Sequence, residues 1–408
     1  MKTLLQINTT GNFGSTGRIA EELGNYVRSK GWKSYIAFAR NPAKSESGLI
    51  KIGSKFDILW HVLMTRLFDK HGFFSILSTK KLIKKIRKIE PDIIHLHNIH
   101  GYFINVELLF HFLSNAKIPV VWTLHDCWSF TGHCTHFSYI GCDKWKTQCF
   151  ECPQQKEYPA SIFLDRSHKN YIDKRKIFNS VDNLQIITVS NWLENTLRQS
   201  FLKNHNIFTI NNGVDLSVFQ PNGDIQMVKA KYNLENKFIL LAVASAWIEK
   251  KGLYELLKLS DYLLENEILV LVGLTKENVK LPSNILNIQR IEVLKELADL
   301  YSCANVVMNL SFQETFGMTT VEGLACGTPS IVYKCTASPE LISDQTGFII
   351  TPGDFHAMRE ALNVIKTNKK EYYLENCRRR AVELYNKDEK YLDYFSVYEN
   401  CSGRLTRL

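Results

Sequence analysis

The stretch "SFQETFGMTTVEGLACGTPS" (residues 311–330) decides the fold of this chain. It follows the apolar run "NVVMNLS" (305–311), which is typical of a buried strand, and its own pattern indicates a helix that begins at Gly317 and ends before Gly327. This order places the amino end of the helix at the carboxyl end of the strand. Free N–H groups and the helix dipole favour a phosphate group at such a position.

Two glutamates, Glu314 and Glu322, flank this phosphate-binding position, and the segment has no Lys or Arg to pair with them. A buried and unpaired carboxylate is costly, so a ligand or a partner is expected. Eight helical residues span about 12 Å, which is near the reach of a nucleotide-sugar. Glu314 is therefore expected to hold hydroxyls of a transferred sugar, and Glu322 those of a ribose. The alternative is a capping carboxylate and a buried, hydrogen-bonded Glu.

The same strand-and-helix alternation continues in both directions along the chain and predicts an α/β fold with two parallel doubly wound sheets. Ligands of such sheets bind at the carboxyl ends of the strands, which favours a cleft between the two domains. The expected strands of the first half are 2–9, 33–39, 92–98, 119–126 and 184–190. Those of the second half are 207–214, 237–245, 267–273, 285–290, 305–311, 329–334 and 347–353.

The length of 408 residues suits two domains of about 200 residues each. We assign the first domain to residues 1–205, with a Cys-rich insertion at 127–165, and the second to residues 225–385. A linker at 206–224 joins them, and a C-terminal helix at 386–408 is expected to pack back toward the first domain.

The composition indicates an ordinary soluble protein, with 45% hydrophobic and 22% charged residues. Apolar runs are shorter than the roughly 18 residues of a membrane helix, and the start "MKTLLQINTTG" has too short an apolar core for a signal peptide. A cytoplasmic location is therefore expected. The net charge of +9 favours an acidic partner, which could be a nucleotide phosphate, an anionic lipid or a nucleic acid.

At this point the residues resemble a known family. "ETFGMTTVE" (314–322) is similar to the Glu-x7-Glu motif of retaining glycosyltransferases of family 4, which have the GT-B fold. Further matches in the family's order are "NNGVDLSVF" (211–219), "AVASAWIEKKGL" (242–253), "EGLACGTPSIV" (322–332) and "TGFIITPGD" (346–354). "LHDCWSFTGHC" (124–134) resembles a bacterial subgroup that assembles surface polysaccharides.

This resemblance implies two Rossmann-like domains that face a cleft. A nucleotide-sugar donor, a UDP- or GDP-sugar, would bind the second domain without a catalytic metal. A saccharide acceptor linked to a lipid diphosphate would bind the first domain, and nucleic acid would not be a partner. The enzyme would then work in the cytoplasm or as a peripheral protein on the inner face of the membrane.

The resemblance also assigns roles to residues of the second domain. Lys251 would face the donor diphosphate, because the leaving group develops negative charge and needs a fixed cation. Backbone amides of Gly317, Met318 and Thr319 would complete the phosphate cradle. The family's usual Arg is replaced by Ala246, and Lys250 and Arg290 are the candidates for a second cation. Arg290 also lies where the family packs the base.

In the first domain, His125 matches a family histidine that contacts the donor sugar. Asp126 is expected to orient His125 or to meet the acceptor. Gly14 and Ser15, in the loop "GNFGSTGRIAEEL" (11–23), would line the cleft, and Ser15 or Thr16 could cap the following helix. The Gly-x-x-Gly-x-x-Gly spacing of this loop differs from a dinucleotide fingerprint, which argues against NAD.

Four cysteines fall within 19 residues: Cys134, Cys142, Cys149 and Cys152. In a cytoplasmic chain this density indicates a structural zinc site rather than disulfides. Only the last pair has the CxxC spacing, and His133 and His136 are competing ligands. Buried free thiols are the alternative.

The segment "STKKLIKKIRKIEPD" (78–92) carries concentrated basic charge, and residues 56–77 before it are aromatic and apolar. Together they could dock on an anionic membrane surface. The alternative is a helix packed on the sheet with a solvated basic face.

Two other classes of function remain open from the residues. The first is a non-enzymatic binding module, stabilised by zinc, for nucleic acid or anionic lipid. The second is another GT-B enzyme, such as a nucleotide-sugar epimerase or a phosphorylase. Two carboxylates in the motif argue against a nucleic-acid groove.

Overall fold

The computed structural model describes residues 1–221, 224–275 and 279–403. The chain divides into two compact units, which are residues 1–210 with 391–408, and residues 211–390. Residues 222–223 of the expected linker and residues 404–408 of the expected C-terminal segment lie outside the described residues.

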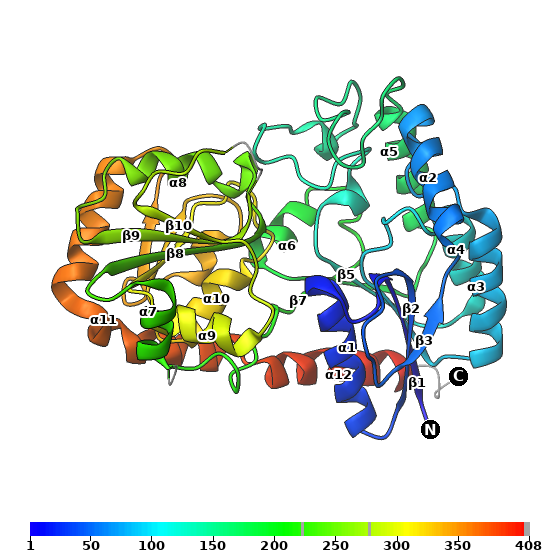
Figure 1. Cartoon of the computed structure of the whole chain (residues 1–408). Helices are drawn as coiled ribbons and strands as arrows, with labels where there is room; N and C mark the ends of the chain where they lie inside the picture. Colours follow the sequence, from blue (N-terminus) through cyan, green and yellow to red (C-terminus); the bar gives the residue numbers. More distant parts are fainter. Residues whose placement is uncertain (222–223, 276–278, 404–408) are drawn as a thin grey trace. The chain divides into compact units, whose positions relative to one another are not determined.

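Within the described residues, the first unit is built on a parallel seven-stranded sheet in the order β3-β2-β1-β4-β5-β6-β7. Helices α1 and α12 cover one face of this sheet, and α3 and α4 cover the other (Figure 1). The strands are β1 (Thr3–Thr10), β2 (Lys33–Arg40), β3 (Gly48–Lys51), β4 (Ile93–Leu96), β5 (Val120–Leu124), β6 (Leu184–Thr188) and β7 (Asn206–Thr209). The helices are α1 (Gly14–Ser29), α2 (Lys55–Phe68), α3 (Ile76–Ile89), α4 (Val106–Ala116), α5 (Ser167–Phe178), α6 (Asn191–Leu197) and α12 (Lys387–Gly403), whose first four residues still belong to the second unit.

The second unit has a parallel six-stranded sheet in the order β10-β9-β8-β11-β12-β13, counted over the residues that are described. Helix α8 lies on one face and α9 and α10 on the other (Figure 1). The strands are β8 (Phe238–Ala246), β9 (Glu267–Leu274), β10 (Ile285–Ile288), β11 (Val306–Asn309), β12 (Ser330–Tyr333) and β13 (Gly347–Ile350). The helices are α7 (Ile225–Tyr232), α8 (Leu253–Ser260), α9 (Leu294–Cys303), α10 (Met318–Ala325) and α11 (Phe355–Tyr385).

The predicted α/β class with two Rossmann-like sheets is therefore confirmed. Two details differ from the sequence analysis. The strand expected at 207–214 in the second half is β7 (206–209), and it belongs to the first sheet: its backbone pairs with β6, and Thr209 Oγ1 lies 2.9 Å from Thr188 Oγ1. The short edge strand β3 was missed because its four residues carry too little pattern to be recognised.

The C-terminal helix α12 completes the core of the first unit. Its residues Tyr391, Tyr394, Phe395 and Tyr398 are buried in one cluster with residues of β1, α1 and β5. The Tyr398 hydroxyl lies 2.6 Å from His95 Nδ1, and the Thr123 hydroxyl donates to the Tyr394 oxygen at 3.2 Å. None of the helices in the described part of the chain combines the length and the apolar character needed to cross a bilayer.

Candidate active site

The stretch that opened the sequence analysis folds as expected. Strand β11 leads through a loop into α10, and Gly317 is the residue that precedes the helix. Gly317 has φ 112°, in the left-handed region, and a Cβ there would lie 2.9 Å from Leu341 Cδ1. Only glycine therefore fits this position without strain. The first turn of α10 contains the half-buried Met318 and Thr319 and no acidic side chain, so its amino end suits an anion.

The two principal residues of the second unit, Lys251 and Glu314, form an ion pair. Lys251 Nζ lies 2.7 Å from Glu314 Oε1, with the two side chains 38% and 18% exposed. The partner expected for Glu314 is therefore Lys251, which comes from the loop after β8 and not from the motif itself. The Glu314 backbone is fixed as well, since its N–H donates to Thr336 Oγ1 at 2.9 Å.

Backbone contacts between the two loops fix the positions of Lys251 and Glu314 relative to each other. Gly252, which follows Lys251, has φ 79°, and a Cβ there would lie 2.3 Å from the Leu310 carbonyl oxygen. The Phe312 N–H donates to the Lys250 carbonyl at 3.0 Å. The loop after β8 and the loop after β11 are thus joined side by side at the carboxyl ends of neighbouring strands.

Glu322 points to a different partner from Glu314. It is half-buried on α10, and its Oε2 accepts a 2.9 Å hydrogen bond from the Tyr301 hydroxyl of α9. Burial raises the pKa of Tyr301, and the adjacent Glu322 carboxylate raises it further, so this tyrosine stays a donor. This geometry agrees with the alternative that Glu322 is a buried, hydrogen-bonded residue. It also fixes the orientation of the carboxylate before any ligand binds.

The structure does not bring Arg290 into the Lys251–Glu314 pair. The Arg290 side chain is 72% exposed, and its Nε lies 3.6 Å from Glu292 Oε1. Its predicted role as a second cation therefore has no support from its position. Ala246, at the end of β8, is exposed and carries no charge.

In the first unit, His125 follows β5 and lies beside His97, which follows β4. The two rings are stacked with centroids 5.5 Å apart, and His97 Nδ1 lies 3.2 Å from His125 Nε2. His97 Nε2 lies 3.0 Å from Gln6 Oε1, and Gln6 Nε2 donates to the Ala20 carbonyl at 2.7 Å.

This chain of contacts fixes the proton positions. Gln6 Oε1 can only accept, so His97 Nε2 carries a hydrogen and His97 Nδ1 is the acceptor. His125 must then donate from Nε2, which leaves Nδ1 as the acceptor of its ring. Burial lowers the pKa of His125 to about 4 against the opposing effect of Asp126, so its imidazole is neutral near pH 7.

Asp126 pairs with His100 rather than with His125. Asp126 Oδ2 lies 2.6 Å from His100 Nε2, and Oδ1 accepts from the Trp128 N–H at 2.9 Å. Burial raises the pKa of Asp126, but the charge and hydrogen bond of His100 outweigh it and lower the pKa to about 2. His100 was missed as a site residue, although its position just after β4 could have signalled it. These groups line a small pocket of about 10 Å³.

The first loop exposes the amino end of α1. The helix begins at Gly14, which has φ 68°, and Phe13 precedes it without a side-chain cap. The expected capping by Ser15 or Thr16 is therefore wrong, because both lie inside the first turn. Gly14 and Ser15 are exposed, and no acidic residue stands in that turn.

The predicted zinc site is not supported. The cysteines of the insertion are free thiols, and the described residues contain no group of three or more His, Cys, Asp or Glu side chains arranged to hold a metal ion. Cys134 and Cys149 are buried, whereas Cys142 and Cys152 are only half-buried. Cys149 Sγ instead accepts a hydrogen bond from the Gly132 N–H at 3.2 Å.

Polar contacts of two buried side chains, Lys174 and His133, hold the insertion. The buried Lys174 donates to the carbonyls of Trp128 and Thr131 at 2.8 and 3.1 Å, and burial lowers its pKa to about 7. His133 Nδ1 lies 2.6 Å from Asp69 Oδ1, and both side chains are buried.

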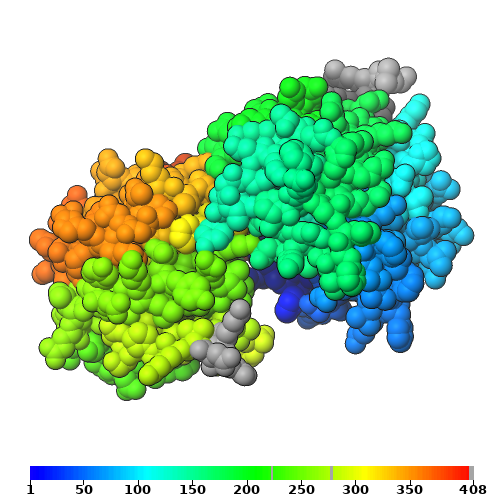
Figure 2. Space-filling model, turned by 90° about the horizontal axis from the view of Figure 1, so that it is seen from above, coloured from blue at the N-terminus to red at the C-terminus, as the bar shows by residue number. Residues whose placement is uncertain are grey.

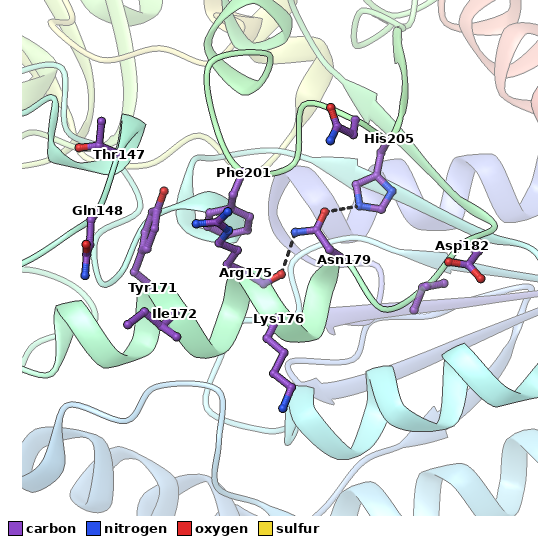
Figure 3. Close-up of a pocket in the computed structure, with 12 residues that line it drawn as sticks. Thr147, Gln148, Tyr171, Ile172, Arg175, Lys176, Asn179, Asp182, Phe201 and His205 are labelled. Atoms are coloured by element: carbon purple, nitrogen blue, oxygen red, sulfur yellow. Dashed lines mark hydrogen bonds between the residues drawn. The ribbon is translucent and has the colours of Figure 1, made fainter.

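A hollow of about 890 Å³ lies elsewhere on the first unit, between α5 and the residues that lead into β7. Figure 3 shows Arg175 of α5 beside Phe201, and Asn179, which directly follows the helix, beside His205. Asn179 is held on both sides, since its Oδ1 lies 3.1 Å from His205 Nε2 and its Nδ2 donates to the Arg175 carbonyl. The hollow contains none of the predicted site residues.

Comparison with known proteins places these features in a family. Residues 16–218 match the family described as Glycosyltransferase Family 4, and residues 224–383 match the one described as Glycosyl transferases group 1. Together these matches cover most of the chain, which therefore belongs to the family 4 glycosyltransferases of the GT-B fold and is a glycosyltransferase.

Individual relatives agree with this assignment. The Escherichia coli (strain K12) protein WcaC, named as a colanic acid biosynthesis glycosyl transferase, is 22% identical over 97% of this chain and 99% of its own. Sucrose-phosphate synthase from Thermosynechococcus elongatus superimposes with a TM-score of 0.71 at 17% identity, over 98% and 99% of the two chains. Anabaena HepE, solved with UDP-glucose, superimposes with a TM-score of 0.67 at 14% identity, over 100% of each chain.

Proposed function

We propose that this chain is a retaining, metal-independent glycosyltransferase that moves a sugar from a nucleotide-sugar to a saccharide linked to a lipid diphosphate. The product would be part of a bacterial surface polysaccharide such as a capsule or a lipopolysaccharide. The transfer takes place at the cytoplasmic face of the membrane. The second unit binds the donor, and the first unit binds the acceptor.

The observation that carries this proposal is the Lys251–Glu314 ion pair at the carboxyl ends of β8 and β11. A departing nucleoside diphosphate gains negative charge, which a fixed ammonium group stabilises most in the transition state. Lys251 supplies this charge, and the amides of Gly317, Met318 and Thr319 complete the cradle at the start of α10. Glu314 orients Lys251 and accepts hydrogen bonds from sugar hydroxyls.

Glu322 holds the ribose in this proposal. Its Oε2 already accepts from Tyr301, and a carboxylate has room for further donors such as two ribose hydroxyls. Tyr301 thus sets the direction of the carboxylate, and Glu322 then distinguishes a nucleotide from a bare diphosphate.

His125 acts as a neutral hydrogen-bonding group. Its Nε2 lies 3.2 Å from His97 Nδ1, which fixes the ring at the carboxyl end of β5, where the transferred sugar is expected. A pKa near 4 leaves little imidazolium at neutral pH, so His125 positions the sugar and does not donate a proton. Asp126 supports the same loop through His100, and the exposed start of α1 at Gly14 and Ser15 offers amides to the acceptor's phosphate.

The chemical step is a front-face substitution. The bond between the anomeric carbon and the donor phosphate oxygen breaks, and the acceptor oxygen bonds to that carbon on the same face. The acceptor hydroxyl gives its proton to the departing phosphate oxygen. The products are the extended saccharide, with retained configuration, and a nucleoside diphosphate.

The relatives support the donor and pathway parts of this proposal. HepE is solved with UDP-glucose, which favours a UDP-sugar as the first donor to test. WcaC is named for colanic acid biosynthesis, which favours an acceptor in the assembly of a surface polysaccharide.

The testing experiment has two stages. Thermal-shift titration of the purified chain with UDP, GDP, ADP and their common sugars selects the donor. Transfer from that donor to a synthetic lipid-diphosphate saccharide is then measured with and without EDTA, and the product anomer is identified by NMR. Retained configuration with EDTA-resistant turnover is expected. An inverted product, loss of activity in EDTA, or transfer only to acceptors without the lipid diphosphate would each overturn the corresponding part of the proposal.

A further inference from the structure

Helix α2 differs from an ordinary surface helix, because polar side chains lie on its buried side and large apolar side chains lie on its exposed side. Its polar residues His61 and Thr65 are fully buried, whereas four large apolar side chains are exposed. These four are Phe56 (82% exposed), Leu59 (64%), Trp60 (58%) and Leu63 (49%). Their spacing of i, i+3, i+4 and i+7 places them on a single face of the helix.

Hydrogen bonds hold the helix in this orientation. His61 Nδ1 lies 2.8 Å from Ser75 Oγ, and His61 Nε2 accepts from the Gly72 N–H at 3.2 Å. Burial lowers the pKa of His61 to about 3, which keeps the ring neutral in this setting. The outward apolar stripe is therefore the consequence of a specific inward contact.

The apolar surface extends beyond α2 onto two neighbouring segments. Ile76 and Leu77, at the start of α3, are 48% and 70% exposed. In the Cys-rich insertion, Ile162, Phe163 and Leu164 are 57%, 71% and 51% exposed. The insertion meets α2 directly, because the Ile162 N–H donates to the Arg66 carbonyl at 2.8 Å. Figure 2 shows the blue surface of the α2 region beside the teal-to-green surface of the insertion.

Basic residues are concentrated in the segment that carries α2 and α3. Residues 54–89 contain nine Lys or Arg and only two acidic residues, Asp57 and Asp69. Asp69 is buried against His133, and Asp57 is held by Ser54 in the capping box of α2. On α3, Leu82 and Ile86 are buried while Lys80, Lys81, Lys84 and Lys85 are exposed.

This combination selects one partner. A contiguous exposed apolar patch of this kind marks an interaction surface. A second copy of the chain would bring the same lysines together, so a self-pairing of this face is electrostatically unfavourable. A bilayer with anionic lipid satisfies both properties, because it accepts the apolar stripe and attracts the lysines of α3.

We propose that the docking face, defined as the α2 stripe with residues 76–77 and 162–164, inserts into the interface of a membrane that contains anionic lipid. The lysines of α3 contact the headgroups. The inserted element is therefore α2, and the basic helix α3, which the sequence analysis paired with residues 56–77, has an accessory role. The biological sense of this docking rests on the proposed lipid-linked acceptor.

Vesicle flotation of the full chain tests the docking face. Binding is expected with phosphatidylcholine vesicles that contain about 30 mol % phosphatidylglycerol. Pure phosphatidylcholine vesicles should bind far less, and about 0.5 M salt should weaken the binding to anionic vesicles. The Leu59→Ser/Trp60→Ser variant should reduce vesicle binding about tenfold or more. Tyr372→Ser is the matched control, because Tyr372 is 57% exposed and lies in the second unit.

Two double variants distinguish the effect of the lysines on α3 from the effect of net charge. Lys81→Glu/Lys84→Glu should reduce vesicle binding about tenfold or more. Lys33→Glu/Lys203→Glu makes the same change in net charge at exposed sites outside the docking face and should leave most binding intact.

Trp60 provides a direct probe of insertion. All seven tryptophans lie in the described residues, and Trp60 is the exposed one among them. Anionic vesicles should shift the emission of the wild-type chain to the blue. Trp60→Phe should bind equally well but lose this shift.

The outcomes separate this inference from the proposed function. Wild-type chain that ignores anionic vesicles, or variants of the α2 stripe that bind normally, would overturn the docking face. Dimerisation of the wild-type chain that the Leu59→Ser/Trp60→Ser variant abolishes would assign the face to a second copy. Thermal stabilisation by the donor and transfer to a detergent-soluble acceptor should be unchanged in these variants. Vesicle binding by a chain without any transfer activity would instead count against the proposed function alone.

Discussion

Lys251 Nζ lies 2.7 Å from Glu314 Oε1, although 63 residues separate the two in sequence. The contact joins the loop after β8 to the loop after β11, so the position of the cation depends on the fold of both loops. Each residue also compensates the charge of the other before a diphosphate arrives. Changing either one therefore alters the charge balance that the donor meets.

We expect Glu314→Gln to reduce kcat about 100-fold or more, because the amide neither orients Lys251 as an ion pair nor accepts sugar hydroxyls equally well. The free energy of unfolding should change by less than about 1 kcal/mol, since Lys251 is partly exposed. Steady-state kinetics and chemical denaturation measure the two effects. Asp299→Asn is the control, because it breaks another 2.7 Å ion pair, with Lys295 on α9. Normal turnover in Glu314→Gln would remove this residue from the site.

Glu322→Ala is expected to weaken nucleotide binding about tenfold or more, while kcat at saturating donor stays near the wild-type value. The physical reason is the loss of the carboxylate that the Tyr301 hydroxyl orients. Isothermal titration with the selected nucleoside diphosphate measures this loss. Tyr301→Phe should give a smaller change in the same direction, and Glu292→Ala, on an exposed side chain, should give none. A Glu322→Ala variant with unchanged nucleotide affinity would restrict this glutamate to a structural role.

The stability of the first unit should fall as the pH drops below about 6.5. Burial lowers the pKa of His61 to about 3 and holds the pKa values of His71, His95 and His97 well below their usual range. The unfolded chain then binds protons that the folded chain does not, so the free energy of unfolding rises with pH through this window. Each such histidine contributes about 1.4 kcal/mol per pH unit well below 6.5.

Calorimetry at about pH 7.5, 6.5 and 5.5 measures this pH dependence. His133 opposes it, because the hydrogen bond and charge of Asp69 raise its pKa despite burial. His97→Gln should flatten the pH dependence of the first unit's transition. His356→Gln should not, because His356 is exposed and lies in the second unit. A transition that keeps the same temperature from pH 7.5 to 5.5 would contradict the prediction.

Cys152 should be the thiol that alkylates fastest near neutral pH. A hydrogen bond from the Cys134 thiol lowers the pKa of Cys152 to about 7, while burial opposes this effect and the charge of His133 assists it. Iodoacetamide labelling followed by peptide mass spectrometry should therefore reach half its maximum rate near pH 7. Cys335 serves as the internal control, because burial raises its pKa. Cys134→Ala should move the Cys152 midpoint upward, and an unchanged midpoint would exclude the thiol–thiol contact.

The strand-and-helix order and the start of α10 could be predicted because apolar periodicity and glycine placement act locally in sequence. The same local information could not reveal that Lys251 pairs with Glu314, or that Asp126 turns to His100. Those contacts depend on which strands become neighbours in the sheet. The zinc prediction failed for a related reason, since the spacing of four cysteines does not show whether a buried Lys174 already fixes the segment.

The sequence predicted a docking region at residues 56–77 and 78–92 but could not assign a role to each segment. The first segment is apolar and aromatic and the second is basic, and both were candidates. The orientation of α2 could not be predicted, because an apolar residue is taken as core unless its neighbours are known. The polar contacts of His61 decide which side of α2 faces inward.

Because of helix α12, folding of the first unit depends on the order in which the chain is synthesised. Its four buried aromatic residues come from the last part of the chain, yet they fill the core beside β1, the first strand. During synthesis, the second unit emerges before those residues do. The core of the first unit therefore cannot be completed until residues 391–398 have left the ribosome. A helix made after the whole second unit closes the domain that was started first, so a chain interrupted between the two leaves its first domain unfinished.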